Sequence, residues 1–523
     1  MSNFFSGKND QTNSEDSNTA KKLREAQMKN YRKESQQNKF ANSRFRTAVM
    51  NSDAQQKMDF SLYHLENHNL SQILLQKIPE WSHLPPQNDQ LYDFLSSIRS
   101  TDILEQHKGI IGLRRILSQK TCLPIQEVLD HPSLATILSL TKKTEEPHLQ
   151  LEAAWCLANL ASGSTEETSS LIKKGVIDIF IKLSKSSMTQ IAEQAIWGLG
   201  NISGDCVELR TQVLKSEATT VLLELINSTE SEKIKNLIIW VFSNICRMKP
   251  DRESITLPLR KMTTKMIQFF TSTNSEEVKN DAILGMSKCA KSACISEFAK
   301  DDFLSQLKIY YDSLIENQND NVTRIVAIHN ILGGLTSSTF EHTFMVVKNG
   351  FLSSLCLSLE SPIDERIREI CWIISNIAIG EVDQIKMLLN EPGLFQKIVK
   401  ISESKSNDIS KEALWILCNL TLTRDESILK HLIDNLGILN IFKNNLSLET
   451  DSKKIGLVLE ALRELFEFFE TRKAEGQLNP LTIVTKENGI SSDLERLQIH
   501  KSDSVYLKAL NLLEKNYPLE TCY

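Results

Sequence analysis

The sequence is poor in helix-breaking residues and has no long apolar run. Only 18 glycines and 12 prolines occur among 523 residues, which disfavours a turn-rich β architecture and favours long helical stretches. No apolar segment approaches the roughly 18 residues that cross a bilayer, and the polar N-terminus lacks the apolar core of a secretory signal. We therefore expect an intracellular protein that does not insert into a membrane.

Cysteine pairs and catalytic signatures are also missing. The ten cysteines are scattered, none is spaced C-x-x-C, and no histidine cluster completes a metal-binding set. The sequence contains no G-x-x-x-x-G-K-[ST], no G-x-S-x-G and no H-E-x-x-H motif. We expect no enzyme, no cofactor and no metal site. Buried, reduced thiols are predicted for the cysteines that fall inside helical patterns: Cys156, Cys246, Cys289, Cys371 and Cys418.

Charge is distributed unevenly along the chain. The net charge is −6, but nine Lys/Arg against two Glu between Lys21 and Arg46 give this stretch +7 and leave −13 for the rest. An acidic body disfavours nucleic acid as a partner. A basic segment with few apolar residues is typical of an arm that is disordered alone and folds on a partner. We expect disorder over 1–20, such an arm over 21–50 and a polar linker over 51–88.

A short motif recurs through the rest of the chain. It reads Glu-Ala-Ala-Trp-Cys-Leu-Ala-Asn at 152–159, and the tryptophans of its five copies are separated by 42, 43, 132 and 43 residues. Helical patterns broken every 40–47 residues indicate armadillo or HEAT repeats, which bury their apolar faces only by stacking. The sequence predicts an all-α solenoid of about ten repeats over 89–517, followed by a tail at 518–523. Glycines at 175, 350 and 437 are predicted to open new helices.

The motif predicts two faces of one helix. Ala154, Leu157 and Ala161 form an apolar stripe that packs inward, whereas Trp155 and Asn159 lie on a neighbouring stripe with Glu152. A single periodic tryptophan is usually a core residue. Because five tryptophans share the same polar neighbours, we favour a ladder of Trp and Asn on one surface of the solenoid.

Such a ladder has the chemistry to hold an extended basic peptide. An asparagine side chain can donate to and accept from a peptide backbone without reading its sequence. Indole faces accept Lys or Arg, each contact being worth on the order of 0.5–2 kcal/mol. Carboxylates at the rim, at Asp205, Glu369 and Glu412, favour a cationic ligand.

The segments Asn159–Thr168, Glu193–Asp205, Ser243–Arg247 and Ser504–Tyr517 closely resemble the importin alpha (karyopherin alpha) family of nuclear import adaptors. The resemblance implies a right-handed solenoid of three-helix armadillo repeats that binds nuclear localisation signals in its concave groove. It implies a major signal-binding site at Trp155, Asn159, Gly163, Thr168, Gln194, Trp197, Asn201, Asp205, Trp240 and Asn244. It implies a minor site at Ser337, Thr343, Glu369, Trp372, Asn376, Glu412, Trp415 and Asn419.

The resemblance extends to the basic arm and has gaps in the middle of the chain. The arm is similar to the family's importin-beta-binding segment through Lys21, Lys22, Arg24, Arg32 and Lys33. The family pattern is lost between the two sites and after them, at Leu284, Lys288, Asn330, Gly334 and Glu464.

The partners implied are basic cargo proteins, importin beta and an export factor for recycling, with shuttling between cytoplasm and nucleus. The alternative is an armadillo scaffold that binds other extended partners without importin beta.

Overall fold

The structure is a computed structural model, and it describes residues 73–74, 76–78, 80–81, 88–119, 123–247, 253–290, 294–316, 322–474 and 477–517. The segments predicted as disordered (1–20), as the basic arm (21–50) and as the tail (518–523) lie outside the described residues. Part of the predicted linker is described and is helical. Leu74 and Ile78 are buried there, and the carbonyl of Trp81 accepts a hydrogen bond from Arg115 Nη1 at 2.8 Å.

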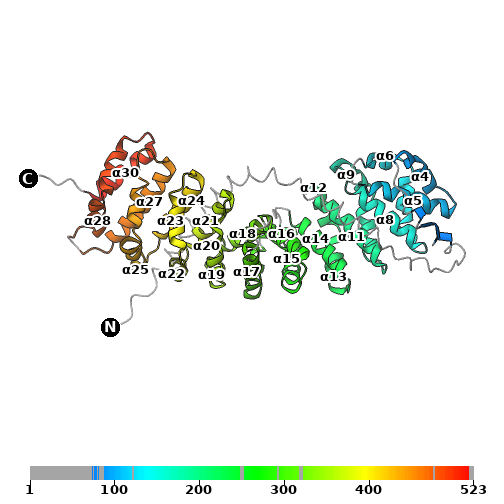
Figure 1. The fold of residues 1–523 in the computed structure, drawn as a ribbon, viewed down its shortest axis with the longest axis horizontal. Coiled ribbons are helices and arrows are strands. Elements are labelled where there is room, and N and C mark those ends of the chain that lie inside the picture. The colour runs from blue at the N-terminus through cyan, green and yellow to red at the C-terminus, as the bar shows by residue number, and fades with distance from the viewer. Residues whose placement is uncertain are drawn as a thin grey trace, which may run out of the picture. The chain divides into compact units, whose positions relative to one another are not determined.

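Every regular element within the described ranges is a helix, as predicted (Figure 1). The helices form two compact units, which we call the N-terminal unit (described residues up to Glu297) and the C-terminal unit (Phe298 onward). Each unit is built from repeats in which three successive helices pack together. The aligned tryptophans and asparagines belong to the third helix of each repeat.

The third helices pack one against the next within each unit. In the N-terminal unit they are α5 (Ile103–Leu117), α8 (Pro147–Leu160), α11 (Thr189–Gly204), α14 (Glu232–Ile245) and α16 (Glu276–Cys289). In the C-terminal unit they are α18 (Val322–Thr336), α21 (Asp364–Ile377), α24 (Asn407–Leu420), α27 (Ser452–Glu470) and α30 (Asp503–Asn516). These ten third helices agree with the predicted number of repeats.

The remaining helices are the first and second members of the repeats. The first helices are α6 (Ile125–Asp130), α9 (Thr165–Lys173), α12 (Val207–Lys215), η4 (Ile295–Phe298), α19 (Phe340–Lys348), α22 (Val382–Asn390), α25 (Glu426–Lys430) with η5 (His431–Asn435), and α28 (Pro480–Asn488). The second helices are α4 (Leu91–Ile98), preceded by η3 (Asn88–Gln90), α7 (Ser133–Leu140), α10 (Val176–Leu183), α13 (Ala218–Ser228), α17 (Asp301–Glu316), α20 (Phe351–Ser358), α23 (Leu394–Ser402), α26 (Ile438–Lys443), and α29 (Ile490–Arg496) with η6 (Leu497–Ile499). One long helix, α15 (Glu253–Ser272), takes the place of both in the fifth repeat.

Glycines set the corner between first and second helices. Gly175, Gly350 and Gly437 have φ of 84°, 78° and 64°, and each immediately precedes a second helix. Side chains with a Cβ rarely adopt this left-handed conformation, so glycine lets the chain turn sharply there. The predicted helix starts at these glycines are confirmed.

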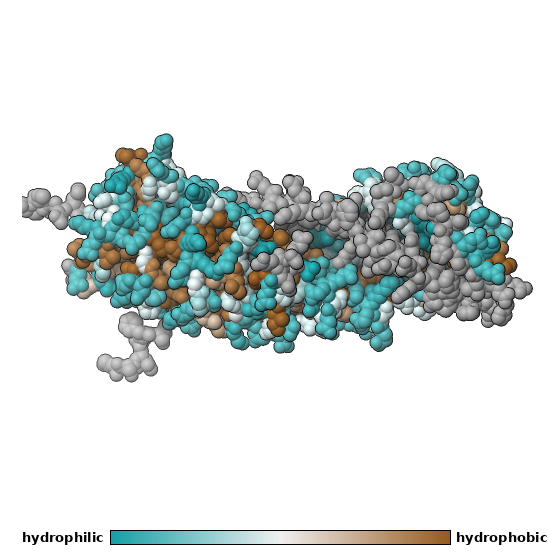
Figure 2. Space-filling view, in the orientation of Figure 1, coloured by the Kyte–Doolittle hydropathy of each residue, from teal (hydrophilic) through white to brown (hydrophobic). Residues whose placement is uncertain are grey.

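The core is continuous along each unit and consists of aliphatic and aromatic side chains. Ala154, Leu157 and Ala161 are all buried, which confirms the predicted inward stripe. The five cysteines predicted to be buried are buried, and none forms a disulfide. No helix among the described residues is long and apolar enough to cross a membrane. Figure 2 shows a mostly hydrophilic visible surface, with apolar patches over the C-terminal unit.

Candidate functional site

The predicted site residues lie on the third helices and on the turns that follow them. In the N-terminal unit, α8, α11 and α14 carry three consecutive tryptophan–asparagine pairs, and in the C-terminal unit α21 and α24 carry two. Neighbouring helices of each series pack against each other (Figure 1). The structure therefore brings the predicted major-site residues together in one unit and the predicted minor-site residues in the other. We call each series of aligned Trp and Asn positions a ladder.

Each ladder asparagine joins its helix to the preceding third helix. The amide nitrogens of Asn201, Asn244 and Asn419 donate to backbone carbonyls of the preceding repeat at 2.9, 3.1 and 2.9 Å. Asn159 donates to the hydroxyl of Ser118 at 3.1 Å, and Asn376 donates to the hydroxyl of Thr336 at 3.4 Å. One amide hydrogen is thus used within the protein. The second hydrogen and the amide oxygen have the chemistry to bind a peptide backbone.

The prediction that the ladder side chains stand clear of the core is wrong at several positions. Trp155 and Trp372 are only 6% and 4% exposed, whereas Trp197, Trp240 and Trp415 are half-buried. Most of the ladder asparagines are buried as well, because their side chains form hydrogen bonds to the preceding repeat. The buried polar members are Asn159, Gln194, Asn244, Asn376 and Asn419.

Small residues on the preceding helix provide the seats for two of the indoles. A Cβ built on Gly200 would lie 1.9 Å from Cζ3 of Trp240, and one on Gly333 would lie 1.9 Å from Cζ3 of Trp372. Both glycines occupy the position immediately before the ladder asparagine or its equivalent. The residue at this position also supplies the carbonyl that accepts from Asn201, Asn244 or Asn419. Its side chain must be small to leave room for the indole, and its backbone must lie close to the next third helix for the hydrogen bond to form.

The two half-buried indoles of the N-terminal unit touch each other. The rings of Trp197 and Trp240 have centroids 6.3 Å apart and an interplanar angle of 64°, an edge-to-face arrangement. Such geometry is favourable because the positive ring edge meets the negative ring face. Within the part of the chain that the structure describes, no cation lies over either ring.

The polar side chains predicted to form a lysine pocket lie at and near the C-terminal end of α11. Asp205 ends this helix, is half-buried, and accepts a hydrogen bond from the hydroxyl of Thr165 at 2.8 Å. The hydroxyl of Thr168 is buried and has no hydrogen-bond partner among the described residues. Gly163 precedes α9, where Ser164 and Glu167 form a reciprocal capping box that fixes the turn. These side chains supply the two groups that the predicted lysine pocket would use, a carboxylate at Asp205 and a buried hydroxyl at Thr168.

The corresponding turn of the C-terminal unit has a different pattern of hydrogen bonds. Thr343 is fully buried like Thr168, but its hydroxyl bonds to the carbonyls of Thr336 and Thr339 at 3.2 and 2.9 Å. Ser337 is half-buried, and its hydroxyl donates to the carbonyl of Gly334 at 3.2 Å. The predicted carboxylates Glu369 and Glu412 are half-buried on α21 and α24.

A layer of buried charge lies behind the first tryptophan of the N-terminal unit. Arg114 Nε donates to Glu152 at 2.8 Å, both side chains are 2% exposed or less, and the guanidinium lies 4.7 Å from the ring centroid of Trp155. The rings of His107 and His148 stack beside them, with centroids 5.5 Å apart. Burial lowers the pKa of His107 to about 4 and the pKa of His148 well below its usual value. Both histidines are therefore neutral at pH 7, and Arg114 is the cation that balances Glu152.

The C-terminal unit has a different group at the equivalent place. His329 Nδ1 lies 3.7 Å from the carboxylate of Glu369, and His329 Nε2 is 2.6 Å from the hydroxyl of Tyr311. The same hydroxyl is 2.9 Å from that of Ser358, and burial raises the pKa of Tyr311.

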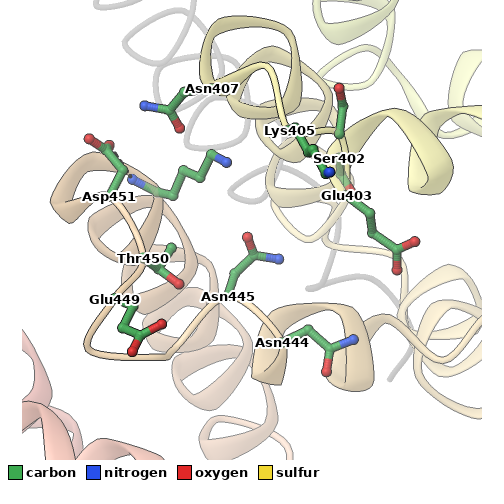
Figure 3. Close-up of a pocket in the computed structure, with 11 residues that line it drawn as sticks. Ser402, Glu403, Lys405, Asn407, Asn444, Asn445, Glu449, Thr450 and Asp451 are labelled. Carbon is green, nitrogen blue, oxygen red and sulfur yellow. Dashed lines mark hydrogen bonds between the residues drawn. The ribbon is translucent and has the colours of Figure 1, made fainter.

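A separate polar pocket lies between the turns that precede α24 and α27 (Figure 3). Lys405, Glu403 and Asn407 border it on one side, and Asn445, Asp451 and neighbouring residues border it on the other. Its lining mixes both signs of charge, and no ladder residue contributes to it. It has no feature that selects a ligand, so the ladders remain the candidate site.

Sequence reasoning missed three contributors to this site. Gly200, Gly333 and Arg114 shape the positions of ladder tryptophans, yet none of them is a Trp or Asn of the recurring Trp-x-x-x-Asn pattern. A signal for them exists in the sequence. The residue before each ladder asparagine is always small or short: Ala158, Gly200, Ser243, Ser375 and Cys418. Arg114 itself stands four residues before Ser118, the same spacing as Trp155 to Asn159, and so occupies the tryptophan position of the first repeat.

Known proteins match this chain at two scales, over a single repeat and over most of the chain. Residues 164–204 match the armadillo/beta-catenin-like repeat family. Importin subunit alpha-2 of Arabidopsis thaliana is 32% identical over 36% of this chain and 35% of its own. Importin subunit alpha-8 of the same plant is 24% identical over 82% of this chain and 94% of its own. The rice protein importin subunit alpha-1a is 26% identical over 82% of this chain and 80% of its own.

The chain is similar to importin alpha proteins over most of its length. This similarity confirms the resemblance seen in the motifs. The match to the first of these relatives spans only about a third of that protein's length, and its identity of 32% is higher than that of the two longer matches. These relatives are named as importin subunits and not as enzymes, in agreement with the prediction that the chain is not an enzyme. A crystal structure of an engineered protein aligns over 82% of this chain and 98% of its own, with a TM-score of 0.64 and 21% identity. That likeness supports the all-α armadillo fold and nothing more specific.

Proposed function

We propose that this importin alpha relative is a nuclear import adaptor that binds Lys/Arg-rich nuclear localisation signals of cargo proteins. The observation that carries the proposal is the pairing of half-buried indoles, Trp197 and Trp240, with the pocket at Asp205 and Thr168. An extended segment with several basic residues would place cations over the rings and one ammonium in the pocket, while the ladder asparagines bind its backbone.

The C-terminal unit is proposed as a second, weaker site for a shorter basic cluster. It has two complete ladder pairs rather than three, and the hydroxyl of Thr343 already has partners. A signal with two basic clusters would occupy both units.

Coupling to the import machinery is proposed for the basic arm. Lys21, Lys22, Arg24, Arg32 and Lys33 lie outside the described residues, so this part of the proposal rests on the sequence resemblance. It includes importin beta as the carrier, an export factor for recycling, and shuttling between cytoplasm and nucleus.

Two binding measurements test the proposal. Fluorescence polarisation with a lysine-rich single-cluster peptide should give saturable binding, and a peptide with its lysines replaced by glutamates should not bind. A pull-down with importin beta should succeed with the full chain and fail when the five basic arm residues are alanine. Peptide binding without importin beta binding would favour the scaffold alternative, and absence of both would contradict the adaptor.

A further inference from the structure

The first tryptophan of the N-terminal ladder already has a cation on its ring. The guanidinium of Arg114 lies 4.7 Å from the centroid of Trp155, inside the range of a cation–π contact. Arg114 also occupies the tryptophan position of the first repeat, so it meets Trp155 as Trp197 meets Trp240.

Arg114 is held firmly in this place. Glu152 accepts from Nε at 2.8 Å and from Nη2 at 3.4 Å, and the arginine and glutamate side chains are 2% and 0% exposed. Moving either partner away would leave the other as an unpaired buried charge, which is strongly unfavourable. A peptide lysine therefore cannot displace Arg114 from the ring at moderate cost.

The next two tryptophans differ in both respects. Trp197 and Trp240 are half-buried, while Trp155 is 6% exposed. Among the described residues, no arginine or lysine covers either of these rings. The rings available for a ligand cation in this unit thus begin at Trp197.

We propose that Arg114 is a built-in occupant of the first tryptophan and thereby determines how many basic residues the N-terminal site reads. The inference rests on the proposed function and makes it more specific. The ligand is a short segment whose basic residues meet Trp197, Trp240 and the pocket at Asp205. A further basic residue that extends toward Trp155 adds little affinity, because the guanidinium of Arg114 already occupies the face of that ring.

Peptides of graded length test this specificity. A core peptide of one basic cluster is extended by Arg or by Ala, at its amino end in one pair and at its carboxyl end in another. For the wild-type chain, the Arg and Ala extensions should bind within about twofold of each other at both ends. The double variant Arg114→Ala with Glu152→Gln removes both buried charges and opens the space that the arginine fills beside the Trp155 ring. It should prefer the Arg extension at one end by about three- to tenfold, the value of one partly desolvated cation–π contact.

A preference of that size already present in the wild type, or no preference in the double variant, would overturn the proposal. If the double variant does not fold by circular dichroism, a second comparison applies. Trp155→Leu should weaken binding of the core peptide by less than about threefold, and Trp197→Leu by about tenfold or more. Equal losses would contradict the assignment. A wild-type chain that does not bind the core peptide at all would instead contradict the proposed function.

Discussion

The two units use the same connections between repeats but place different groups around them. In both, ladder asparagines donate to the preceding third helix, as Asn244 does in the N-terminal unit and Asn419 in the C-terminal unit. The ladders end differently. The N-terminal ladder starts at Arg114, whereas the C-terminal ladder ends at Glu460 and Glu464, which stand at the tryptophan and asparagine positions of α27.

The features that the two units share hold the repeats together, and the features in which they differ are those that would contact a ligand. The hydrogen bonds from the asparagine side chains are common to both units and maintain the stacking of third helices. In α27 an ion pair takes the place of the asparagine hydrogen bond, because Arg424 of the preceding repeat lies 3.2 Å from the carboxylate of Glu464. The features that favour a lysine, the free hydroxyl of Thr168 and the carboxylate of Asp205, are found in the N-terminal unit. We therefore expect the N-terminal unit to dominate binding.

Acidification should destabilise the N-terminal unit most. The pKa of buried His107 is lowered from 6.5 to about 4, and the pKa of buried His148 is also lowered well below its usual value, chiefly by burial in both cases. Between about pH 4 and pH 6.5 the unfolded chain binds more protons at His107 than the folded chain does, so this contribution to stability is complete above about pH 6.5 and is lost as the pH decreases toward 4. His107 alone accounts for a loss of up to about 3 kcal/mol. Hydrogen exchange at pH 7.5 and pH 5 should show loss of protection centred on α5 and α8.

The control for this experiment is His107→Gln with His148→Gln. This variant should keep the same protection in α5 and α8 at both values of pH, relative to its own neutral state. An equal acid response of the variant and the wild type would rule out the two histidines as the cause.

Removing the pocket charge should separate the two sites. Asp205→Asn keeps the shape of the side chain and its bond from Thr165 but removes the charge that attracts an ammonium group. Affinity for a single-cluster basic peptide should fall by about a hundredfold, since a charge-assisted contact is lost in a partly buried place. The matched variant Glu412→Gln in the C-terminal unit should change it by less than about threefold. Titration by fluorescence polarisation decides, and a larger effect of Glu412→Gln would reverse the ranking of the units.

Filling the glycine seats should damage each ladder selectively. In Gly200→Ala and Gly333→Ala the new methyl group would collide with Trp240 and Trp372, respectively. Each substitution should cost about 2 kcal/mol in stability and displace its indole. Gly200→Ala should reduce binding of a single-cluster peptide, whereas Gly333→Ala should reduce only the additional affinity of a two-cluster peptide. Calorimetry with both peptides measures this, and the same loss in both variants would contradict separate sites.

The ion pair of the last ladder position should contribute least. Arg424 is 38% exposed and Glu464 is 17% exposed, so solvent screens their attraction. A double-mutant cycle with Arg424→Gln and Glu464→Gln should give a coupling below about 1 kcal/mol that decreases with added salt. A coupling of several kcal/mol, unchanged by salt, would mean that the pair is as important as the buried Arg114–Glu152 pair.

The repeat length, helix types and ladder positions could be predicted from the sequence, because each depends on spacing along one chain segment. Gly175 and its equivalents were predictable for the same reason. The burial of Trp155 and Asn159 was not predictable in this way, since it depends on Arg114 and Ser118 of another repeat. The role of Gly200 was likewise hidden, because its partner Trp240 belongs to the next repeat and not to its own helix. Helical periodicity identifies the neighbours of a residue on its own helix, not the side chains that meet it from the next one.

The most direct test of the central claim is hydrogen–deuterium exchange of the full chain with one equivalent of a lysine-rich single-cluster peptide. We expect added protection in α11, α14 and the turn at 163–168, with much smaller changes in α21 and α24. Equal protection in both units would contradict it, as would protection confined to residues outside the ladders, such as the pocket before α24 and α27.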